Sequence, residues 1–135
     1  MRYVPSLPRA LVEEATRHHH ATWGRGSTQE EHTAHNFEQL ERAGPELLRY
    51  AGLVDEGGLV ASFKRYALLL HHEARGVIRA MGVGAVFTRP SARGRGAASA
   101  LLKEAMREAA DLGDEAALLY SDIDPAFYAR PEGSR

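Results

Sequence analysis

Apolar residues recur at helical spacing in the first part of the chain. Residues 8–23 place Leu11, Ala15 and either Thr22 or Trp23 on one side, with charged residues elsewhere. This period predicts an amphipathic helix, which the glycines after Trp23 are expected to end.

A second helix is predicted to follow these glycines. Residues 27–30 have the pattern of a capping box, in which the Ser27 hydroxyl and the Glu30 side chain satisfy main-chain amides of the first turn. The helix is expected to end near Gly44 and Pro45. The residues that it is expected to bury are Ala34, Phe37 and Leu40.

The period then changes to that of strands. Segments 47–54 and 59–70 read as two strands joined by a glycine-containing hairpin turn. In segment 77–88 both alternating sets of positions are largely apolar, as in a strand that is covered on both faces. Gly82 and Gly84 interrupt this strand and indicate either a bulge or a close approach by another backbone or a ligand.

The strongest helical stripe lies in the second half of the chain. Its members are Ala98, Leu101, Leu102, Ala105, Ala109 and Leu112. Gly113 is placed to cap this helix, segment 116–121 reads as a further strand, and Asp124-Pro125 begins a short helix. The order predicts an α/β (α+β) domain with a mixed central sheet and helices on both faces.

Composition narrows the class of protein. The 135 residues are 44% hydrophobic and 26% charged, with a formal net charge of −1, so no strong field attracts nucleic acid or an anionic membrane. No apolar run approaches the ~18 residues of a membrane-spanning helix. The chain has no cysteine, which excludes disulfides, thiolate metal sites and cysteine nucleophiles. We expect one soluble, cytoplasmic domain.

The candidate chemistry lies between the buried strand and the long helix. Residues 93–98, Arg93-Gly94-Arg95-Gly96-Ala97-Ala98, place unpaired main-chain amides of a first helical turn beside two arginines. The glycines allow an anionic group to approach the backbone, and the guanidinium groups add charge and hydrogen bonds. The loop lacks the lysine-serine/threonine ending of a Walker loop and the glycine spacing of a dinucleotide fingerprint. A pyrophosphate site is therefore predicted, with a simple turn as the alternative.

The segment from Val83 to Ala98 resembles motif A of the GNAT acetyltransferases. The arginine-x-x-glycine-x-glycine/alanine core of that motif is matched at Arg93, Gly96 and Ala98. Segments 118–121 and 126–128 resemble motif B, a strand followed by a short helix with a late Phe-Tyr pair. Together the matches cover roughly residues 77–130.

This resemblance implies a direct transfer of an acetyl group from acetyl-coenzyme A to an amine of a small molecule or peptide. Main-chain amides from Gly94 to Ala98 would bind the co-substrate, with its pantetheine arm along the strand that ends at Phe87 and Thr88. Ser121 matches a position that often touches the pantetheine. Tyr128 matches the general acid toward the departing thiolate, although a core aromatic is the alternative for this residue.

The chain departs from the family pattern after Tyr128, where a glycine-phenylalanine pair and two further strands are usual. Without those strands an exposed sheet edge would favour association, for example as a homodimer. The predicted organisation is a single domain, with a helical acceptor side at 1–44, strands at 45–92 and the coenzyme A side at 93–130. A non-catalytic acyl-coenzyme A binding module and a truncated partner subunit are the alternatives to an enzyme.

The histidines do not predict a metal site. Consecutive residues on a helix point about 100° apart, so His18, His19 and His20 cannot converge on one ion, and a solvated helix face is expected. His71 or His72, or the neighbouring Glu73, is a weak alternative as the base of an acceptor site.

Overall fold

The computed structural model describes residues 1–24 and 26–119, and all statements on the structure concern these residues. Its elements in chain order are β1 (Arg2–Val4), α1 (Arg9–Trp23), α2 (Gln29–Ala43), β2 (Leu48–Asp55), β3 (Gly58–His72), β4 (Gly76–Thr88), a 3-10 turn (Pro90–Ala92), α3 (Ala97–Asp111) and β5 (Ala116–Leu119). The predicted order of two helices, three strands, a long helix and a strand is confirmed, and β1 is added to it. The short helix predicted from Asp124 lies outside the described residues.

The five strands form one mixed sheet in the order β1-β2-β3-β4-β5. Neighbouring strands from β1 to β4 are antiparallel, and β4 pairs with β5 in parallel through the α3 connection. β1 has only three residues before Pro5, so its sequence carries no alternating pattern, and it is fixed by pairing with residues 52–54 of β2.

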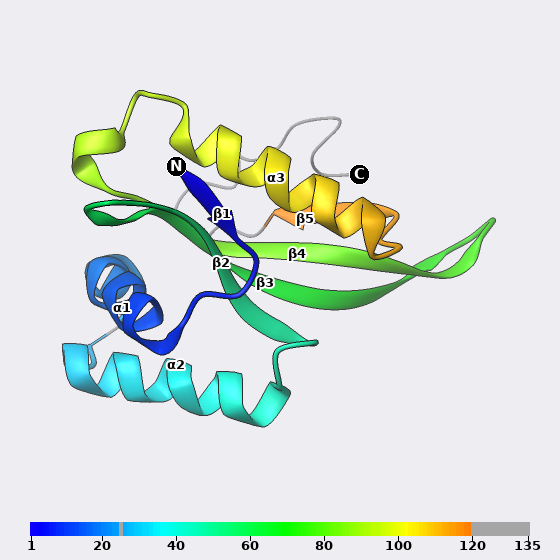
Figure 1. Cartoon of the computed structure of the whole chain (residues 1–135). Helices are drawn as coiled ribbons and strands as arrows, with labels where there is room; N and C mark the ends of the chain where they lie inside the picture. The colour runs from blue at the N-terminus through cyan, green and yellow to red at the C-terminus, as the bar shows by residue number, and fades with distance from the viewer. Residues whose placement is uncertain (25, 120–135) are drawn as a thin grey trace.

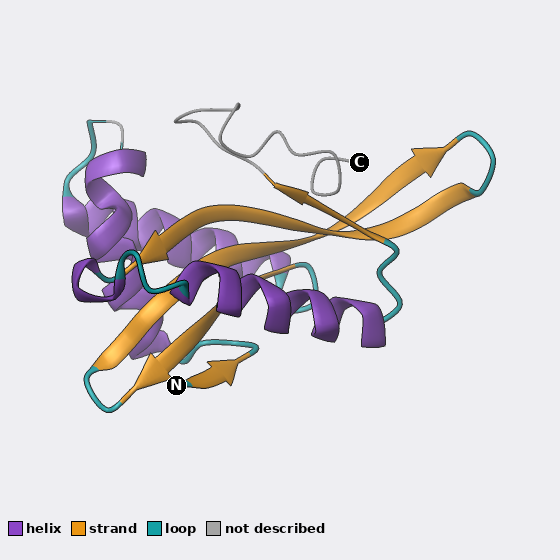
Figure 2. Cartoon of the chain, turned by 90° about the horizontal axis from the view of Figure 1, so that it is seen from above, coloured by secondary structure: helices purple, strands orange, loops and turns teal. Residues whose placement is uncertain are grey.

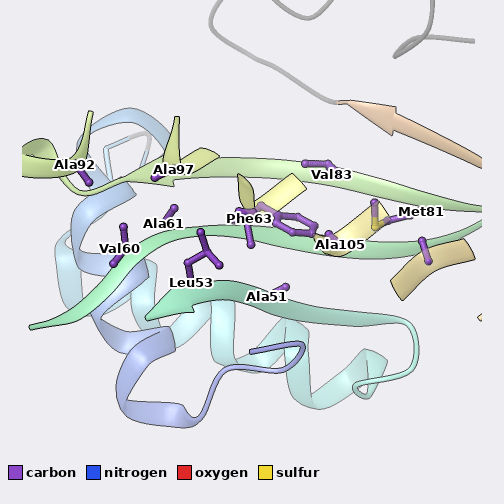
Figure 3. Packing of buried hydrophobic residues seen from close by; sticks show 12 residues of the cluster. Ala51, Leu53, Val60, Ala61, Phe63, Met81, Val83, Ala92, Ala97 and Ala105 are labelled. Carbon is purple, nitrogen blue, oxygen red and sulfur yellow. The ribbon is translucent and has the colours of Figure 1, made fainter. Parts of the chain in front are cut away.

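Helices cover both faces of the sheet, with α1 and α2 on one face and α3 on the other (Figures 1 and 2). The predicted apolar stripe of α3 is confirmed at Leu101, Ala105 and Ala109, which are buried. They pack against Phe63, Met81 and other sheet residues in the cluster drawn in Figure 3. Burial of a leucine such as Leu101 contributes about 1.5–3 kcal/mol, so this face anchors α3 and the loop before it.

The start of α2 differs by one residue from the expectation. Thr28, not Ser27, is the N-cap: its Oγ1 accepts from the Glu31 amide at 3.0 Å, and the Glu31 carboxylate accepts from the Thr28 amide at 2.8 Å. The Ser27 hydroxyl instead donates to the Gly24 carbonyl oxygen. Ser27 therefore belongs to the turn after α1, and the reciprocal cap is built from Thr28 and Glu31.

The buried face of α2 is also not the one expected. Ala34 is exposed and Phe37 and Leu40 are only half-buried, whereas the buried residues of the helix are His32 and Asn36. The prediction was wrong because α2 turns polar side chains inward, where groups from α1 and β2 satisfy their hydrogen bonds.

Candidate functional site

The loop between β4 and α3 has the backbone conformation of an anion-binding turn. Gly94 and Gly96 have φ angles of 80° and 75°, in the left-handed region that residues with a Cβ rarely adopt. At each glycine, no atom of the described residues, apart from those of its chain neighbours, lies within 4 Å of the position that a Cβ would take. The chain conformation therefore requires the glycines, and the space beside them is open to a ligand.

Most of the loop amides that the sequence predicted to be free are free. Among the described residues, the main-chain N–H groups of Gly94, Gly96, Ala97 and Ala98 have no hydrogen-bond acceptor. Arg95 differs, because its N–H donates to a carbonyl oxygen of the preceding 3-10 turn at 3.3 Å. The N-terminus of a helix of 15 residues also carries a partial positive charge. These groups can hold an anion.

The arginines around the loop have different partners. Arg89 makes a bidentate pair with Asp55, at 2.7 and 3.2 Å, and this hydrogen bonding lowers the pKa of the carboxyl group. Arg93 donates from Nε to the Thr88 carbonyl oxygen at 3.2 Å. Arg95 is exposed and has no ion pair among the described residues. Arg95 thus supplies positive charge to the open loop, and the set of groups fits a diphosphate.

β4 is bulged just before it reaches this loop. Its pairing with β3 shifts between Lys64↔Gly84 and Ser62↔Phe87, so that Ala85 and Val86 face the single residue Phe63. Ala85 has a φ of 48°, an uncommon value for a residue with a Cβ. The bulge predicted from the glycines is confirmed, and it lies immediately after Gly84.

Gly84 is also a point of close approach, but by a side chain rather than by the backbone or ligand that the sequence suggested. A Cβ at this position would lie 3.2 Å from Cε1 of Tyr66, so the tyrosine ring packs on the bare backbone. The approaching group is a side chain of the neighbouring strand β3.

Phe87 and Thr88 end β4 next to the loop, as expected, but they have different environments. The Phe87 side chain is 7% exposed and stacks on His18, with ring centroids 4.5 Å apart. Its side chain belongs to the core beneath α1, so only its main chain is placed for contact with a co-substrate. Thr88 is half-buried.

Two predicted site residues, Ser121 and Tyr128, lie outside the described residues. The described part of β5 pairs with β4 from Ala80↔Ala116 to Val83↔Leu119. β5 therefore lies on the opposite side of β4 from β3, the strand that carries Lys64.

A buried polar network that the sequence did not reveal lies between the sheet and the two N-terminal helices. His32 Nε2 is 2.9 Å from His19 Nδ1, His19 Nε2 is 3.1 Å from the Tyr50 hydroxyl, and that hydroxyl donates to Asn36 Oδ1 at 3.0 Å. Because the Tyr50 hydrogen is used by Asn36, His19 must donate from Nε2 and accept at Nδ1 from His32. All three hydrogen bonds are thus satisfied with both imidazoles neutral.

The environment keeps these imidazoles neutral. Burial, followed by the charges of His32 and Lys64, lowers the pKa of His19 to about 3. The pKa of His32 is lowered by burial and then by His20 and Lys64. Burial and the nearby Tyr66 raise the pKa of Tyr50. The network therefore holds its protons in one fixed arrangement near neutral pH.

The solvated face expected for the three consecutive histidines is wrong for His19, which is 4% exposed. His20 Nε2 is 2.6 Å from the Ser27 carbonyl oxygen, to which it donates, and His18 stacks on Phe87. The available signal was positional, because His19 lies four residues after the buried Ala15, on the same helix face.

The same face of the sheet holds Lys64, which is 9% exposed. Its Nζ donates to Gln39 Oε1 at 3.3 Å and lies 5.7 Å from the centre of the Tyr50 ring. Burial alone lowers the pKa of this amine to about 8. A partly neutral amine therefore lies on the strand that pairs with the bulged segment of β4.

His71, His72 and Glu73 are far from the loop. They lie at the tip of the β3–β4 hairpin, which projects from the sheet at the end of β4 opposite to Thr88 (Figure 2). His72 Nδ1 accepts from two amides of its own turn, at 3.2 Å each. The weak interpretation of these residues as an acceptor-site base does not agree with this placement.

The described part of the chain has neither a candidate metal site nor a candidate membrane span. It contains no group of three or more histidine, aspartate or glutamate side chains placed to hold a metal ion. None of its helices has the length and apolar character needed to cross a bilayer.

Comparisons with known proteins agree with this geometry. A family model described as an acetyltransferase (GNAT) domain matches residues 6–131. The search of curated proteins gives no match.

Similar solved structures share the fold at low identity. A transcriptional regulator from Bacillus halodurans C-125 has a TM-score of 0.73 and 14% identity, over 93% of this chain and 84% of that chain. A ribosomal-protein-alanine N-acetyltransferase from Brucella melitensis biovar Abortus 2308 has a TM-score of 0.69 and 19% identity, over 94% and 85%. A predicted acetyltransferase from Clostridium acetobutylicum with acetyl-CoA has a TM-score of 0.67 and 16% identity, also over 94% and 85%.

Proposed function

Because the chain belongs to the GNAT acetyltransferase family and has the acyltransferase fold of that family, we propose that it transfers an acetyl group from acetyl-coenzyme A directly to an amine. The observation that carries the proposal is the loop before α3, with the free amides of Gly94, Gly96, Ala97 and Ala98 and the guanidinium of Arg95, which has no ion pair among the described residues. The similarity to a solved acetyltransferase structure with acetyl-CoA supports the choice of donor.

The loop binds the diphosphate of the co-substrate by hydrogen bonds from the main chain. Such bonds to an anion are charge-assisted and about twice as strong as neutral ones. The glycines keep side chains away from the phosphates, and Arg95 adds a fifth donor group from its side chain. The thioester end then lies along the end of β4, beside the main chain of Phe87 and Thr88.

The acceptor is a small-molecule or peptide amine that attacks the thioester without a covalent enzyme intermediate. We assign the helical segment 1–44 to the acceptor side, with Ser121 near the pantetheine and Tyr128 as the acid that protonates the leaving thiolate. A phenol suits this role, because its usual pKa of ~10 keeps it protonated at neutral pH.

Titration calorimetry with acetyl-coenzyme A tests the binding half of the proposal. Arg95→Ala is expected to weaken binding about tenfold, since one charge-assisted contact is worth roughly 1.5 kcal/mol. Arg107→Ala is the matched control: Arg107 is an exposed arginine of α3 that pairs with Glu104, away from the loop. Equal affinities for the two variants, or no binding by the folded wild-type chain, would contradict the proposal.

Release of coenzyme A thiol with a panel of amines tests the chemical half. Tyr128→Phe is expected to reduce turnover while leaving the affinity for acetyl-coenzyme A unchanged. Binding with no thiol release for any amine would instead favour a non-catalytic acyl-coenzyme A module.

A further inference from the structure

Lysine is rare in this chain, and one of the two lysines is buried. The sequence has 15 arginines but only Lys64 and Lys103. Lys103 is exposed on α3, whereas Lys64 is 9% exposed on β3. An arginine cannot lose its proton in a protein, but a buried lysine can. The choice of lysine at the buried position therefore points to a use for a neutral amine.

In the described part of the chain the charge of Lys64 faces the Tyr50 ring, 5.7 Å from Nζ, but no opposite charge. Among the described residues no carboxylate forms an ion pair with it, and its one hydrogen bond goes to the exposed amide of Gln39 at 3.3 Å. The next residue, Arg65, is equally buried but is paired with Asp114 at 2.8 Å and with Glu108 at 3.6 Å. A buried cation that serves stability is paired. Lys64 is not, and burial lowers its pKa to about 8.

Lys64 lies opposite β4 just before the bulge, and the proposed thioester lies just after the bulge, beside the main chain of Phe87 and Thr88. Lys64 pairs with Gly84, the last residue before the bulge. On its own face of the sheet, among the described residues, it interacts with neutral titratable groups, namely the imidazoles of His19 and His32 and the phenol of Tyr50. The long, flexible lysine stem and the weak contact with Gln39 leave the amine free to change position.

We propose that Lys64 is an internal acceptor, which takes the acetyl group from acetyl-coenzyme A bound at the loop of this same chain. The inference rests on the proposed function. The neutral Nζ adds its electron pair to the thioester carbonyl carbon, a C–N bond forms and the C–S bond breaks. The sulfur leaves with the electron pair of that bond, and the proton lost by nitrogen passes to the thiolate or to solvent. The products are acetylated Lys64 and coenzyme A thiol.

Acetylation removes the charge but retains a donor. The amide N–H that remains can still donate to Gln39, and the uncompensated ammonium is gone. Acetylation therefore weakens the attraction of this face of the sheet for anions and water.

The test uses the full chain incubated with acetyl-coenzyme A, with peptide mass spectrometry at both lysines and calorimetry on the same sample. Lys64 is expected to be acetylated at least about tenfold faster than the exposed Lys103, because a bound thioester acts at a high effective concentration. Arg95→Ala should slow the reaction at Lys64 and leave that at Lys103 unchanged. Lys64→Arg should remove the signal, and Lys103→Arg should not.

A second measurement needs no acetyl-coenzyme A. Trace labelling with acetic anhydride, a reagent that does not depend on the loop, should modify the exposed Lys103 faster than Lys64. Its pH dependence should give Lys64 a pKa near 8. The proposal is supported if acetyl-coenzyme A modifies Lys64 faster than Lys103 and acetic anhydride modifies Lys103 faster than Lys64.

The outcomes separate this inference from the proposed function. If calorimetry detects bound acetyl-coenzyme A but Lys64 stays unmodified, or reacts no faster than Lys103, the internal acceptor is overturned and the proposed function stands. If acetyl-coenzyme A does not bind, both are overturned.

Discussion

Consecutive residues of β3 carry buried positive charges to opposite faces of the sheet, and the two faces treat them differently. Toward α3, Arg65 is held by the carboxylates of Asp114 and Glu108. Toward α1 and α2, Lys64 meets imidazoles, a phenol and an amide. The first face compensates charge with charge, whereas the second keeps its groups neutral. The first face pairs its buried cation, and the second leaves its buried cation among neutral hydrogen-bonding groups.

The α3 face is completed by the end of the helix. Gly113, with a φ of 95°, allows the Asp114 amide to donate to the Ala109 carbonyl oxygen at 2.9 Å, the pattern of a Schellman motif. This turn brings the Asp114 carboxylate inward to Arg65. Glu108 also accepts from the Tyr3 hydroxyl at 2.6 Å, so α3 is tied to the first strand of the sheet. The capping glycine predicted from the sequence thus has a second effect, on electrostatics.

The largest expected effect on stability comes from removing a carboxylate that pairs with the buried Arg65. Asp114→Ala leaves the buried Arg65 guanidinium without its nearest carboxylate, and we expect a loss of about 3–5 kcal/mol in the free energy of unfolding. Urea denaturation measures it. Asp111→Ala, which removes an exposed carboxylate from the same helix end, is the control and should change stability little. Similar losses for the two variants would show that Arg65 does not depend on Asp114.

The stability that the buried network of His19, His32 and Tyr50 contributes should fall at acidic pH. The pKa of His19 is about 3 in the folded chain, below its ordinary value of 6.5, so the unfolded state binds more protons between these values. Its stabilising contribution is present above pH 6.5 and is lost as the pH falls toward 3. We expect His19 to account for a loss of about 2 kcal/mol between pH 7 and pH 5.

Urea denaturation at several pH values tests this expectation. In His19→Gln the stability should depend less on pH, whereas His71→Gln, at the exposed hairpin tip, should behave as wild type. An unchanged pH dependence in His19→Gln would mean that the network tolerates a charged imidazole.

A smaller effect is expected at the start of α2, which carries His32 and Asn36 to the network. Thr28→Ala removes the reciprocal cap with Glu31 and should cost about 1 kcal/mol. Ser27→Ala should cost less, because the Ser27 hydroxyl bonds only to the turn after α1. Thermal or urea denaturation measures both losses. A larger loss for Ser27→Ala than for Thr28→Ala would instead support the capping box expected from the sequence, with Ser27 as the N-cap.

The smallest change is expected at Lys64. Lys64→Met removes an uncompensated ammonium and keeps the apolar stem, so stability at neutral pH should change by less than about 1 kcal/mol. The folded pKa of about 8 lies below the ordinary 10.5, so the contribution of Lys64 is present above pH 10.5 and is lost as the pH falls through 8. The wild type should gain stability relative to Lys64→Met as the pH rises from 8 to 10.5. If Lys64→Met lost as much stability as Asp114→Ala, the charge of Lys64 would have to be compensated in the folded chain.

The sequence predicted the elements that depend on local pattern. The α3 stripe, the β2–β3 hairpin and the doubly covered β4 were readable because period and turn residues act within a few positions. β1 was missed because three residues cannot show a period. The buried face of α2 was misjudged because apolar Phe37 and Leu40 lie only half-buried, while polar His32 and Asn36 are satisfied inside.

The candidate site likewise has one part that the sequence predicted and one part that it did not. The glycines and arginines of residues 93–98 were predicted from the sequence alone, because helix-start amides and glycine conformations are properties of a short segment. The network of His19, His32 and Tyr50 was not predicted. Its members come from α1, α2 and β2, and each looks like an ordinary surface or core residue until the elements are packed together.

The amino-acid sequence by itself determined the order of helices and strands, the anion-binding loop before α3 and the resemblance to its family, since these depend on neighbours along the chain. Only the tertiary structure decided which buried cation is paired and which is not. Charge compensation depends on distances between side chains from different elements, and those distances exist only after α1, α2 and α3 have packed on the sheet.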